Sequence, residues 1–272
     1  MEKLSSFRPK KRLGQHFLKD LRIVKKMVEL AKIESDSLII EIGVGKGILT
    51  DELIKKGKYV LGYEIDTSLE LILRKKYENT NNLKIIFSDF LKRDLKSDIE
   101  IGIFNNIYLI ANLPYYITTP IIFKIIKEKI DLKKMIIMVQ KEVGERIIAF
   151  PKTRNYNSLT IILNYLFEIT KVMDVKKDSF QPKPKIDSVV LVFKKRPCKR
   201  SVINEEAFFR LVKDAFQFKR KTLLNNLKDY DLNVIKTFLI KNNLNPFVRA
   251  EEIPIKLFIE MSNLLIKMEN QF

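Results

Sequence analysis

Residues 38–47, with the sequence LIIEIGVGKG, indicate the fold of this chain. The first five form a short apolar run that is typical of a buried strand, and glycines follow it directly. Glycine permits a tight turn and lets a ligand approach the backbone closely. Residues 48–56 then have the pattern of a helix. The stretch therefore predicts a strand, a glycine-rich turn and a helix, with a nucleotide-like ligand at the turn.

Short apolar runs continue to alternate with amphipathic segments as far as residue 140. Further strands are expected at residues 59–64, 84–87, 107–111 and 135–139. Helices are expected at residues 69–77 and 120–129, the second with Pro120 in its first turn. Strands that alternate with helices predict an α/β fold with a doubly wound, mostly parallel sheet.

The pattern changes after residue 166. Residues 167–175 and 188–193 are expected to form two strands around a proline-rich turn at 181–184, as an antiparallel pair added to the sheet. Beyond a basic stretch at 194–197, helical periodicity recurs at residues 205–216, 219–227, 232–240 and 255–268. We therefore place a boundary near Arg196, which predicts a large domain at residues 1–195 and a small all-helical domain at 196–272.

The charge of the chain indicates a polyanionic partner. It contains 51 Lys and Arg against 33 Asp and Glu, a formal net charge of +18. Lys and Arg that neutralise phosphates release condensed counterions, so nucleic acid is the favoured partner. A coding bias toward Lys, Ile and Asn, or a membrane surface, is the alternative explanation.

Few residues of this chain suit metal or nucleophilic chemistry. Cys198 is the single cysteine, which excludes an intramolecular disulfide and a cysteine cluster. His16 is the single histidine, which argues against a zinc site and a Ser-His-Asp triad. The sequence has a polar, basic start and no apolar run of about 20 residues. We therefore expect a cytoplasmic protein without metal or membrane.

Acidic residues end three successive predicted strands. They are Glu41, Glu64 about twenty residues further on, and Asp89. Carboxylates at these positions can accept hydrogen bonds from ribose hydroxyls and an adenine amino group, and they suit a pyrophosphate poorly. The spacing G-x-G-x-G also favours S-adenosylmethionine over NAD or FAD, although all three cofactors use similar loops. Each acid alone is equally explained as a helix cap or a solvated charge.

The sequence Asn112-Leu113-Pro114-Tyr115 follows the fourth predicted strand, where ligands of such sheets bind. The N6 lone pair of adenine is delocalised into the ring. The Asn112 side-chain carbonyl and the Leu113 backbone carbonyl can accept hydrogen bonds from the amino group and so localise that lone pair. Pro114 stiffens the turn, and Tyr115 offers a face for stacking. The motif therefore predicts methyl transfer to an amino group. An ordinary Asn-Pro-type turn with a packed tyrosine is the alternative.

The chain resembles the rRNA adenine-N6,N6-dimethyltransferases over nearly its whole length. Five motifs carry the resemblance: residues 11–18 (KRLGQHFL), 41–47 (EIGVGKG), 112–115 (NLPY), 180–188 (FQPKPKIDS) and 218–223 (FKRKTL). The resemblance implies a Rossmann-like class I S-adenosylmethionine methyltransferase domain. It also implies a mostly parallel seven-stranded sheet and a small all-helical C-terminal domain.

The resemblance also implies roles for single residues. The cofactor pocket is expected to be lined by His16, Leu18, Gly43, Glu64, Asp89, Phe90 and Asn112. The catalytic group is expected to be Asn112, Leu113, Pro114, Tyr115 and Phe180, with the Phe180 ring stacked on the target base opposite Tyr115. Without the family, Phe180 is better explained as a core aromatic. Tyr116 departs from the family pattern, since many members have asparagine there, and it can alter the rim of the pocket.

The RNA contacts are expected to include Lys11, Arg12, Lys219, Arg220 and Lys221. Basic residues alternate with aromatics around the last three, although an amphipathic helix pair with a solvated face has the same pattern. Residues 218–223 resemble the C-terminal domain of the small-subunit enzymes. The implied substrate is two adjacent adenines in a 3′-terminal hairpin of small-subunit (16S) rRNA. Both become N6,N6-dimethyladenosine during ribosome biogenesis, on an immature small subunit and by a monomeric enzyme.

Three other functions remain open. The chain can be a large-subunit (23S) rRNA methylase that confers macrolide resistance. It can use the fold mainly to bind RNA or DNA, as a ribosome-assembly or transcription factor. Finally, it can methylate DNA adenine or protein glutamine, which the residues around Phe180 disfavour.

Overall fold

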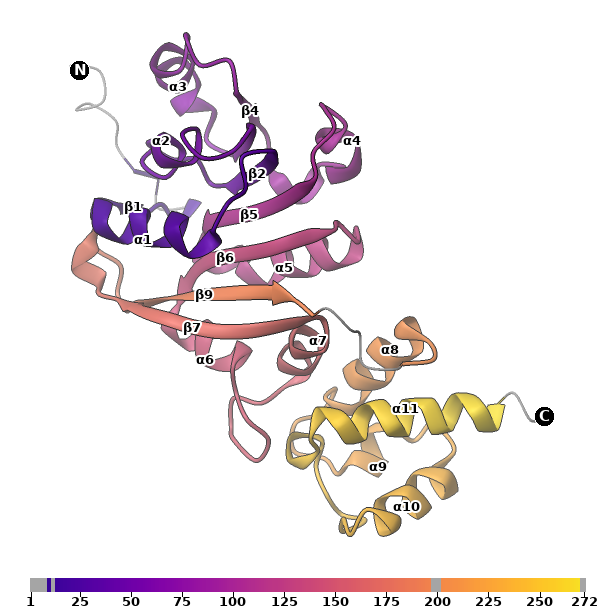
Figure 1. The fold of residues 1–272 in the computed structure, drawn as a ribbon. Coiled ribbons are helices and arrows are strands. Elements are labelled where there is room, and N and C mark those ends of the chain that lie inside the picture. Colours follow the sequence, from indigo (N-terminus) through magenta and orange to yellow (C-terminus); the bar gives the residue numbers. More distant parts are fainter. Residues whose placement is uncertain (1–8, 11–12, 197–201, 270–272) are drawn as a thin grey trace. The chain divides into compact units, whose positions relative to one another are not determined.

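The computed structural model describes residues 9–10, 13–196 and 202–269 of the chain, which form two compact units (Figure 1). The first unit contains the residues up to Gly144 together with Thr170–Lys195. The second contains Glu145–Ile169 together with the residues from Arg196 onward. The chain thus passes between the units three times, and the last passage, after Lys195, lies where the sequence changes character.

A seven-stranded sheet forms the centre of the first unit. In sheet order its strands are β4 (Leu83–Phe87), β3 (Tyr59–Glu64), β2 (Ser37–Ile42), β5 (Asn106–Asn112), β6 (Leu132–Gln140), β9 (Ser188–Lys195) and β7 (Phe167–Val175). The pairs from β4 to β6 are parallel, and β9 runs antiparallel to β6. The predicted doubly wound, mostly parallel sheet is therefore confirmed.

Strand β2 lies between β3 and β5, and every one of its residues is buried. A strand covered on both faces needs apolar residues at successive positions, which explains the unbroken run in its sequence. The chain leaves β2 toward β3 on one side and reaches β5 on the other only later. Ligands of open α/β sheets bind beside such a switch point, outside the carboxyl ends of the strands.

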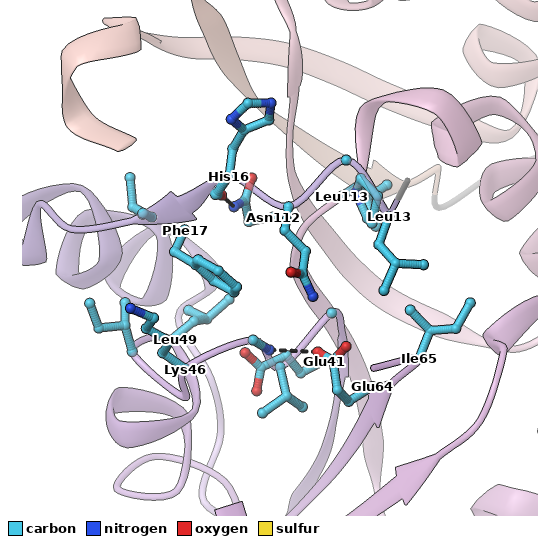
Figure 2. A pocket seen from close by; sticks show the side chains of 18 of the residues that line it. Leu13, His16, Phe17, Glu41, Lys46, Leu49, Glu64, Ile65, Asn112 and Leu113 are labelled. Carbon is cyan, nitrogen blue, oxygen red and sulfur yellow. Dashed lines mark hydrogen bonds between the residues drawn. The ribbon is translucent and has the colours of Figure 1, made fainter. Parts of the chain in front are cut away.

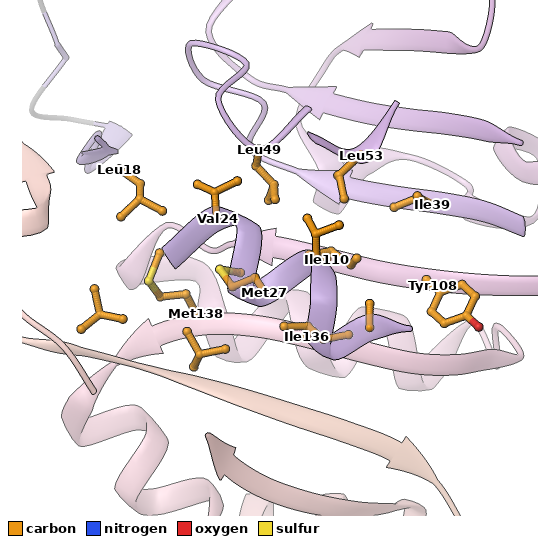
Figure 3. Packing of buried hydrophobic residues seen from close by; sticks show 14 of the residues in the cluster. Leu18, Val24, Met27, Ile39, Leu49, Leu53, Tyr108, Ile110, Ile136 and Met138 are labelled. Atoms are coloured by element: carbon orange, nitrogen blue, oxygen red, sulfur yellow. The ribbon is translucent and has the colours of Figure 1, made fainter. Parts of the chain in front are cut away.

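Helix α1 (Leu21–Ala31) covers one face of the central strands (Figure 3). Its Val24 and Met27 are fully buried and belong to one apolar cluster with Ile110 of β5 and Met138 of β6. Burying an aliphatic side chain of this size contributes about 1.5–3 kcal/mol. The buried residues recur at three- and four-residue spacing, but the sequence analysis did not predict this helix.

The remaining helices of the first unit connect the strands. They are α2 (Thr50–Leu53), α3 (Glu70–Lys76), α4 (Leu95–Ile99), α5 (Thr118–Lys127) and the beginning of α6 (Lys141–Ile147). In Figure 1, α1 lies in front of the central strands and α5 behind them, so both faces of the sheet are covered. The helices predicted at residues 69–77 and 120–129 match α3 and α5 to within two residues at each end.

The helix predicted at residues 48–56 is shorter than expected, since only Thr50–Leu53 are α-helical. The chain must turn back to begin β3, and the Lys58 N–H donates to the Ser37 carbonyl at 3.0 Å. Gly57 lies in this turn so close to β2 that an added Cβ would stand 2.6 Å from Ile39 Cδ1. The close approach of the turn to β2 ends the helix early.

Two very short strands form a second sheet. β1 (Phe17–Leu18) pairs antiparallel with β8 (Phe180–Gln181), so that Leu18 lies opposite Phe180 and Phe17 opposite Gln181. Two residues are too few to show any periodicity, and this pairing was not predicted. It ties the N-terminal segment to the segment that follows β7.

The second unit is helical. Its helices are α7 (Ser158–Leu166), α8 (Glu205–Ala215), α9 (Leu223–Asn226), α10 (Leu232–Lys241) and α11 (Ile255–Glu269). Helix α7 packs against α8 through the rings of Tyr165 and Phe208, whose centroids are 5.0 Å apart. The Tyr165 hydroxyl also donates to Glu205 at 2.9 Å. These contacts explain why residues 145–169 group with the C-terminal helices.

The prediction of a helix at residues 219–227 is wrong for the first half of this range. Residues 219–221 form a turn, and α9 begins only at Leu223. The Thr222 side chain accepts from the Asn225 N–H and so caps the helix. The Asn226 side chain accepts from the Phe218 N–H and donates to the Ala215 carbonyl. These bonds stabilise the turn in place of a first helical turn.

Candidate active site

A pocket opens at the carboxyl ends of β2, β3 and β5 (Figure 2). Three segments provide most of its lining, residues 13–18, 43–46 and 112–115, and Glu41 and Glu64 add two carboxylates. The structure therefore brings together eight of the predicted site residues: His16, Leu18, Gly43, Glu64, Asn112, Leu113, Pro114 and Tyr115.

The glycine loop forms the floor of the pocket in a conformation that few other residues adopt. Gly43 and Gly45 have φ angles of 82° and 57°. The Gly43 N–H donates to the Tyr63 carbonyl at 2.8 Å, which anchors the loop to the end of β3. A Cβ at Gly45 would lie 3.0 Å from the Phe17 ring. Glycine at this position lets the N-terminal segment approach the loop closely.

Glu64 is buried at the end of β3, and backbone donors hold both of its oxygens. Oε2 accepts from the Gly45 N–H at 2.7 Å (Figure 2). Oε1 accepts from the Asp66 N–H at 2.8 Å. Burial raises the pKa of Glu64, and the backbone hydrogen bonds oppose this rise. The carboxylate is therefore held at a defined position between the glycine loop and the pocket.

Glu41 is the more unusual carboxylate, because it is 1 % exposed and only one of its two oxygens has a hydrogen-bond partner among the described residues. Oε2 accepts from the Thr50 hydroxyl at 2.6 Å, whereas Oε1 has no hydrogen-bond partner among the described residues. Burial raises the pKa of Glu41 to about 8. A buried polar atom without a partner is unfavourable by about 1–3 kcal/mol. Since Glu41 lines the pocket, a ligand with a donor or cationic group would satisfy it.

The N-terminal segment lies against the 112–115 loop. The Asn112 Nδ2 donates to the His16 carbonyl at 3.5 Å, shown dashed in Figure 2. The His16 Nδ1 donates to the Pro182 carbonyl at 2.7 Å. The His16 ring also stacks on Tyr115, with centroids 5.6 Å apart and planes inclined by 25°. His16 therefore positions the N-terminal segment against the 112–115 loop and the segment that follows β8.

Tyr115 and Pro114 are held by contacts outside the pocket. The Tyr115 hydroxyl is hydrogen-bonded to Ser188 Oγ at 2.8 Å, and burial raises its pKa. The Pro114 carbonyl accepts from the Thr118 hydroxyl at 3.2 Å. Leu113 is fixed by its N–H, which donates to the Met138 carbonyl of β6 at 3.1 Å. Neighbouring strands and α5 thus fix the loop.

Asp89 and Phe90 lie outside the residues that line the pocket. The Asp89 side chain accepts from the Leu91 N–H at 2.9 Å and caps a short 3₁₀-helix, Phe90–Lys92. Phe90 is buried with its ring edge-on to Tyr63, the centroids 5.0 Å apart. Capping is the alternative that the sequence analysis left open for Asp89. A role for either residue in cofactor binding stays a prediction.

Phe180 is also absent from the pocket lining. Its side chain is 1 % exposed and belongs to the same apolar cluster as Leu18 and Val24. This position matches the core aromatic that the sequence alone favours. A stack on a target base stays a prediction, and it requires the ring to become accessible.

The predicted RNA contacts fall in two places. Lys11 and Arg12 lie outside the described residues. Lys219, Arg220 and Lys221 are exposed in the turn that precedes α9, in the second unit. They are accessible to a polyanion there, and their contact with RNA stays a prediction.

Asp66, just outside the pocket lining, is a positioning residue that was not predicted from the sequence. It is buried two residues after Glu64, and its carboxylate accepts from Lys10 Nζ at 2.6 Å, Gln15 Nε2 at 2.7 Å and the Ser68 hydroxyl at 2.6 Å. Burial alone would raise the pKa of Asp66, but these hydrogen bonds outweigh it and lower the pKa to about 2. Asp66 therefore attaches the N-terminal segment to β3. Its position two residues after the end of β3 is the sequence feature that could have indicated this role.

Two kinds of feature are absent from the described residues. No helix in them has the length and apolar composition needed to span a bilayer. In the same part of the chain, no three His, Cys, Asp or Glu side chains converge as metal ligands do.

The model of the ribosomal RNA adenine dimethylase family matches residues 6–267. The chain belongs to this family. Proteins named ribosomal RNA small subunit methyltransferase A are similar to it over most of their length. The one from Phytoplasma australiense is 44 % identical over 262 residues, covering 93 % of this chain and 90 % of the relative. The one from Bacillus mycoides is 39 % identical over 268 residues, covering 94 % and 91 %.

Solved structures show the same fold. A dimethyladenosine transferase from Plasmodium falciparum superposes with a TM-score of 0.73 at 29 % identity, covering 94 % of this chain and 98 % of the other. The 23S rRNA methyltransferase ErmE superposes with a TM-score of 0.71 at 22 % identity, covering 92 % and 99 %, and shows the fold alone. Family membership confirms the prediction of an S-adenosylmethionine-dependent rRNA adenine dimethyltransferase.

Proposed function

We propose that this protein transfers methyl groups from S-adenosylmethionine to N6 of two adjacent adenines in a 3′-terminal hairpin of small-subunit rRNA. The observation that carries the proposal is the position of Asn112–Tyr115 beside a pocket that contains Glu41 and Glu64. The protein would act as a cytoplasmic monomer on an immature small subunit, with the helical C-terminal domain recognising RNA.

The pocket fits a cationic ligand. The unpartnered Oε1 of Glu41 is available to an ammonium group, and Glu64 is available to the hydroxyls of a ribose. Lys46 is the only Lys or Arg among the described residues that line the pocket, and its ammonium lies 5.3 Å from the centre of the Phe17 ring. Two carboxylates and one cation favour S-adenosylmethionine over a dinucleotide with a pyrophosphate. When bound, this cofactor supplies an electrophilic methyl group.

The 112–115 loop activates the amino group. In the first transfer Asn112 Oδ1 and the Leu113 carbonyl accept hydrogen bonds from the two N6 hydrogens, which localises the nitrogen lone pair and orients it. In the second transfer one N6 hydrogen remains for these acceptors, and each hydrogen that a methyl group replaces leaves as a proton to solvent. Because Asn112 Nδ2 donates to the His16 carbonyl, the amide orientation leaves its oxygen as the acceptor. Positioning and preorganised hydrogen bonds provide most of the rate enhancement, and no strong general base is needed.

Tyr115 presents a face for the target base. Ser188 holds its hydroxyl, and His16 lies on one side of the ring, so the tyrosine does not rotate freely. An adenine must leave its stack to reach this position, which is easiest in a loop that is already unpaired. Phe180 would complete the stack after a local rearrangement that exposes its ring.

Relatives named for the small subunit support the choice of substrate over the large subunit. The test is incubation with tritiated S-adenosylmethionine and immature small subunits that lack dimethyladenosine, followed by nucleoside analysis. We expect N6,N6-dimethyladenosine from these particles and none from naked large-subunit RNA. Label in the large-subunit RNA alone would overturn the proposal, and so would the absence of the product from both.

A further inference from the structure

Three loops of the second unit meet to form one surface, which we call the three-loop surface: residues 150–154, 218–222 and 247–251. The Lys152 N–H donates to the Glu251 carbonyl at 2.7 Å, which joins the first loop to the third. Lys219 Nζ donates to the Arg154 carbonyl at 2.9 Å, which joins the second to the first. Directly after the second loop, the Leu223 N–H donates to the Val248 carbonyl at 2.8 Å.

Each of these loops exposes a phenylalanine. Phe150 is 76 % exposed, Phe218 48 % and Phe247 77 %. Single exposed apolar residues are ordinary, but large rings on three adjoining loops mark a binding surface.

Hydrogen bonds fix the backbone of these loops beside the rings. The Phe150 carbonyl accepts from both the N–H and the hydroxyl of Thr153, at 3.3 and 2.7 Å. The Phe247 N–H donates to the Asn245 side chain at 2.8 Å. In the second loop, Lys221 Nζ lies 4.5 Å from the centre of the Phe218 ring and covers one face of it. Phe150 and Phe247 are thus the two rings that remain most accessible.

The same loops carry a large excess of positive charge. Six exposed cations belong to the three-loop surface: Lys152, Arg154, Lys219, Arg220, Lys221 and Arg249. Within the described part of the chain, no carboxylate forms an ion pair with any of them. Glu251 is the single acid on the surface, and Glu252 beside it accepts from the Arg249 N–H.

We propose that the three-loop surface binds unpaired nucleotides of RNA, with Phe150 and Phe247 stacking on bases and the cations contacting phosphates. Exposed aromatic rings between Lys and Arg side chains are the combination that binds single strands, because every base offers a face to stack on. A duplex would use the cations but leave the rings without a partner, since its bases are already stacked. The inference rests on the proposed function and names the RNA element that the second unit recognises.

The loop at 150–154 precedes the predicted domain boundary at residue 196 in the sequence. Its place on the three-loop surface means that RNA recognition by the second unit is shared between two distant parts of the chain. Neither Phe150 nor Phe247 belongs to a family motif quoted above, and only folding brings them to one surface with residues 218–221.

The test uses the full chain and a fluorescein-labelled, twelve-nucleotide single-stranded RNA, with binding followed by anisotropy over a range of salt concentrations. The double variant Phe150→Ala/Phe247→Ala should bind at least tenfold more weakly, because alanine offers no ring on which a base can stack. Its salt dependence should remain that of the wild type. Lys219→Ala/Lys221→Ala should reduce the slope of log Kd against log salt, since fewer counterions are released.

Three controls make the result specific. Phe150→Tyr/Phe247→Tyr keeps both rings and should bind like the wild type, which separates stacking from a general effect of substitution. Leu71→Ala removes an equally exposed apolar side chain from the first unit and should change nothing. A duplex of the same sequence should bind the wild type and the double alanine variant equally.

Two outcomes would overturn the inference. One is wild-type affinity of the double alanine variant for the single strand. The other is a double alanine variant that no longer binds vesicles of phosphatidylcholine and phosphatidylglycerol but still binds RNA like the wild type. That result would assign the surface to membranes. The proposed function fails separately, since it is judged by dimethyladenosine formation with the wild-type protein. Normal methylation with unchanged RNA binding by the double variant would reject the inference alone.

Discussion

Gln15 Nε2 donates to Asp66 Oδ2 at 2.7 Å, and this bond joins a segment that covers the pocket to the strand end that carries Glu64. Lys10 adds an ion pair with the other oxygen of the same carboxylate at 2.6 Å. The Asp66 N–H meanwhile donates to Glu64. One buried aspartate therefore positions both the N-terminal segment and the carboxylate proposed to bind ribose.

Asp66→Ala should raise the KM for S-adenosylmethionine about tenfold while changing kcat much less. The substitution removes the side-chain bonds to Lys10 and Gln15, and a hydrogen bond to a charged group contributes about 1.5–3 kcal/mol. Steady-state kinetics with a saturating RNA substrate measures both constants. Asp131→Ala, which removes an exposed ion pair with Lys195, is the matched control. An equal fall in kcat with unchanged KM would show that Asp66 does not act through the cofactor.

The anchor at Asp66 should be independent of pH near neutrality. Its pKa of about 2 lies below the unfolded value of about 3.9, so the folded state favours the ionised form. The resulting stabilisation is complete above about pH 4 and is lost as the pH falls toward 2. Acid unfolding of wild type and Asp66→Asn should therefore differ in pH dependence only below about pH 4, as followed by circular dichroism.

The effect of Glu41 on the pH dependence of stability should be opposite to that of Asp66. Its pKa of about 8 lies above the value of 4.5 in the unfolded chain, so between these values the folded protein without cofactor binds more protons than the unfolded one. Stability should then decrease as the pH rises from about 4.5 to 8 and become constant above 8. Urea unfolding at several pH values gives the slope of the unfolding free energy against pH for the wild type and for Glu41→Gln, and the two slopes should differ. Parallel slopes across this range would contradict the buried, protonated state.

Much of the fold was predictable because the central strands are determined mainly by one requirement, the burial of apolar side chains. β2, β3 and β5 are buried, and their apolar runs are interrupted at the glycine loop and at Asn112, so sequence pattern and burial coincide. Short elements behaved differently. β1 and β8 have two residues each, and only their mutual pairing makes them strands. The turn at 219–221 depends on the Asn226 side chain, which no periodicity reports.

The position of the pocket was predictable for a similar reason, whereas the roles of its residues stay predictions. Glu64 and Asn112 end strands of one parallel sheet, and the carboxyl ends of such strands lie at one edge. Asp66 was missed because its role arises from residues 51 and 56 positions earlier in the chain. Asp89 and Phe180 illustrate the remaining difficulty. A capping aspartate and a core aromatic have the same local sequence as a ligand-binding aspartate and a stacking ring, so the roles of Asp89 and Phe180 toward cofactor and base stay predictions.

Gly45→Ala should weaken cofactor binding and destabilise the fold by about 1–2 kcal/mol, because a positive φ is unfavourable for any residue with a Cβ. The added methyl would also press on the Phe17 ring at 3.0 Å. Isothermal calorimetry and thermal unfolding measure the two effects. Gly102→Ala is the control for the φ effect. Gly102 is exposed and is not among the glycines with positive φ, but its added methyl would also lie 3.1 Å from a ring, that of Phe104. Unchanged affinity in Gly45→Ala would mean that the loop has room that the structure does not show.

Asn112→Ala should lower the rate of methyl transfer by a hundredfold or more, while S-adenosylmethionine still binds measurably. The variant loses the acceptor that localises the N6 lone pair, and a preorganised hydrogen bond of this kind is commonly worth a factor of 10² to 10³ in kcat. Glu41 and Glu64 remain in the pocket, so affinity should fall only modestly. Single-turnover transfer of tritiated methyl groups separates chemistry from binding.

Asn112→Asp refines this last prediction. Aspartate keeps an acceptor oxygen at the position of the amide but loses the donor to the His16 carbonyl. It should therefore transfer methyl groups faster than Asn112→Ala and more slowly than the wild type. Asn105→Ala removes an exposed amide that bonds to Asp36 at the opposite end of β5 and should have wild-type activity. Near-normal transfer by Asn112→Ala would refute activation of the amino group by this loop, whatever the other variants do.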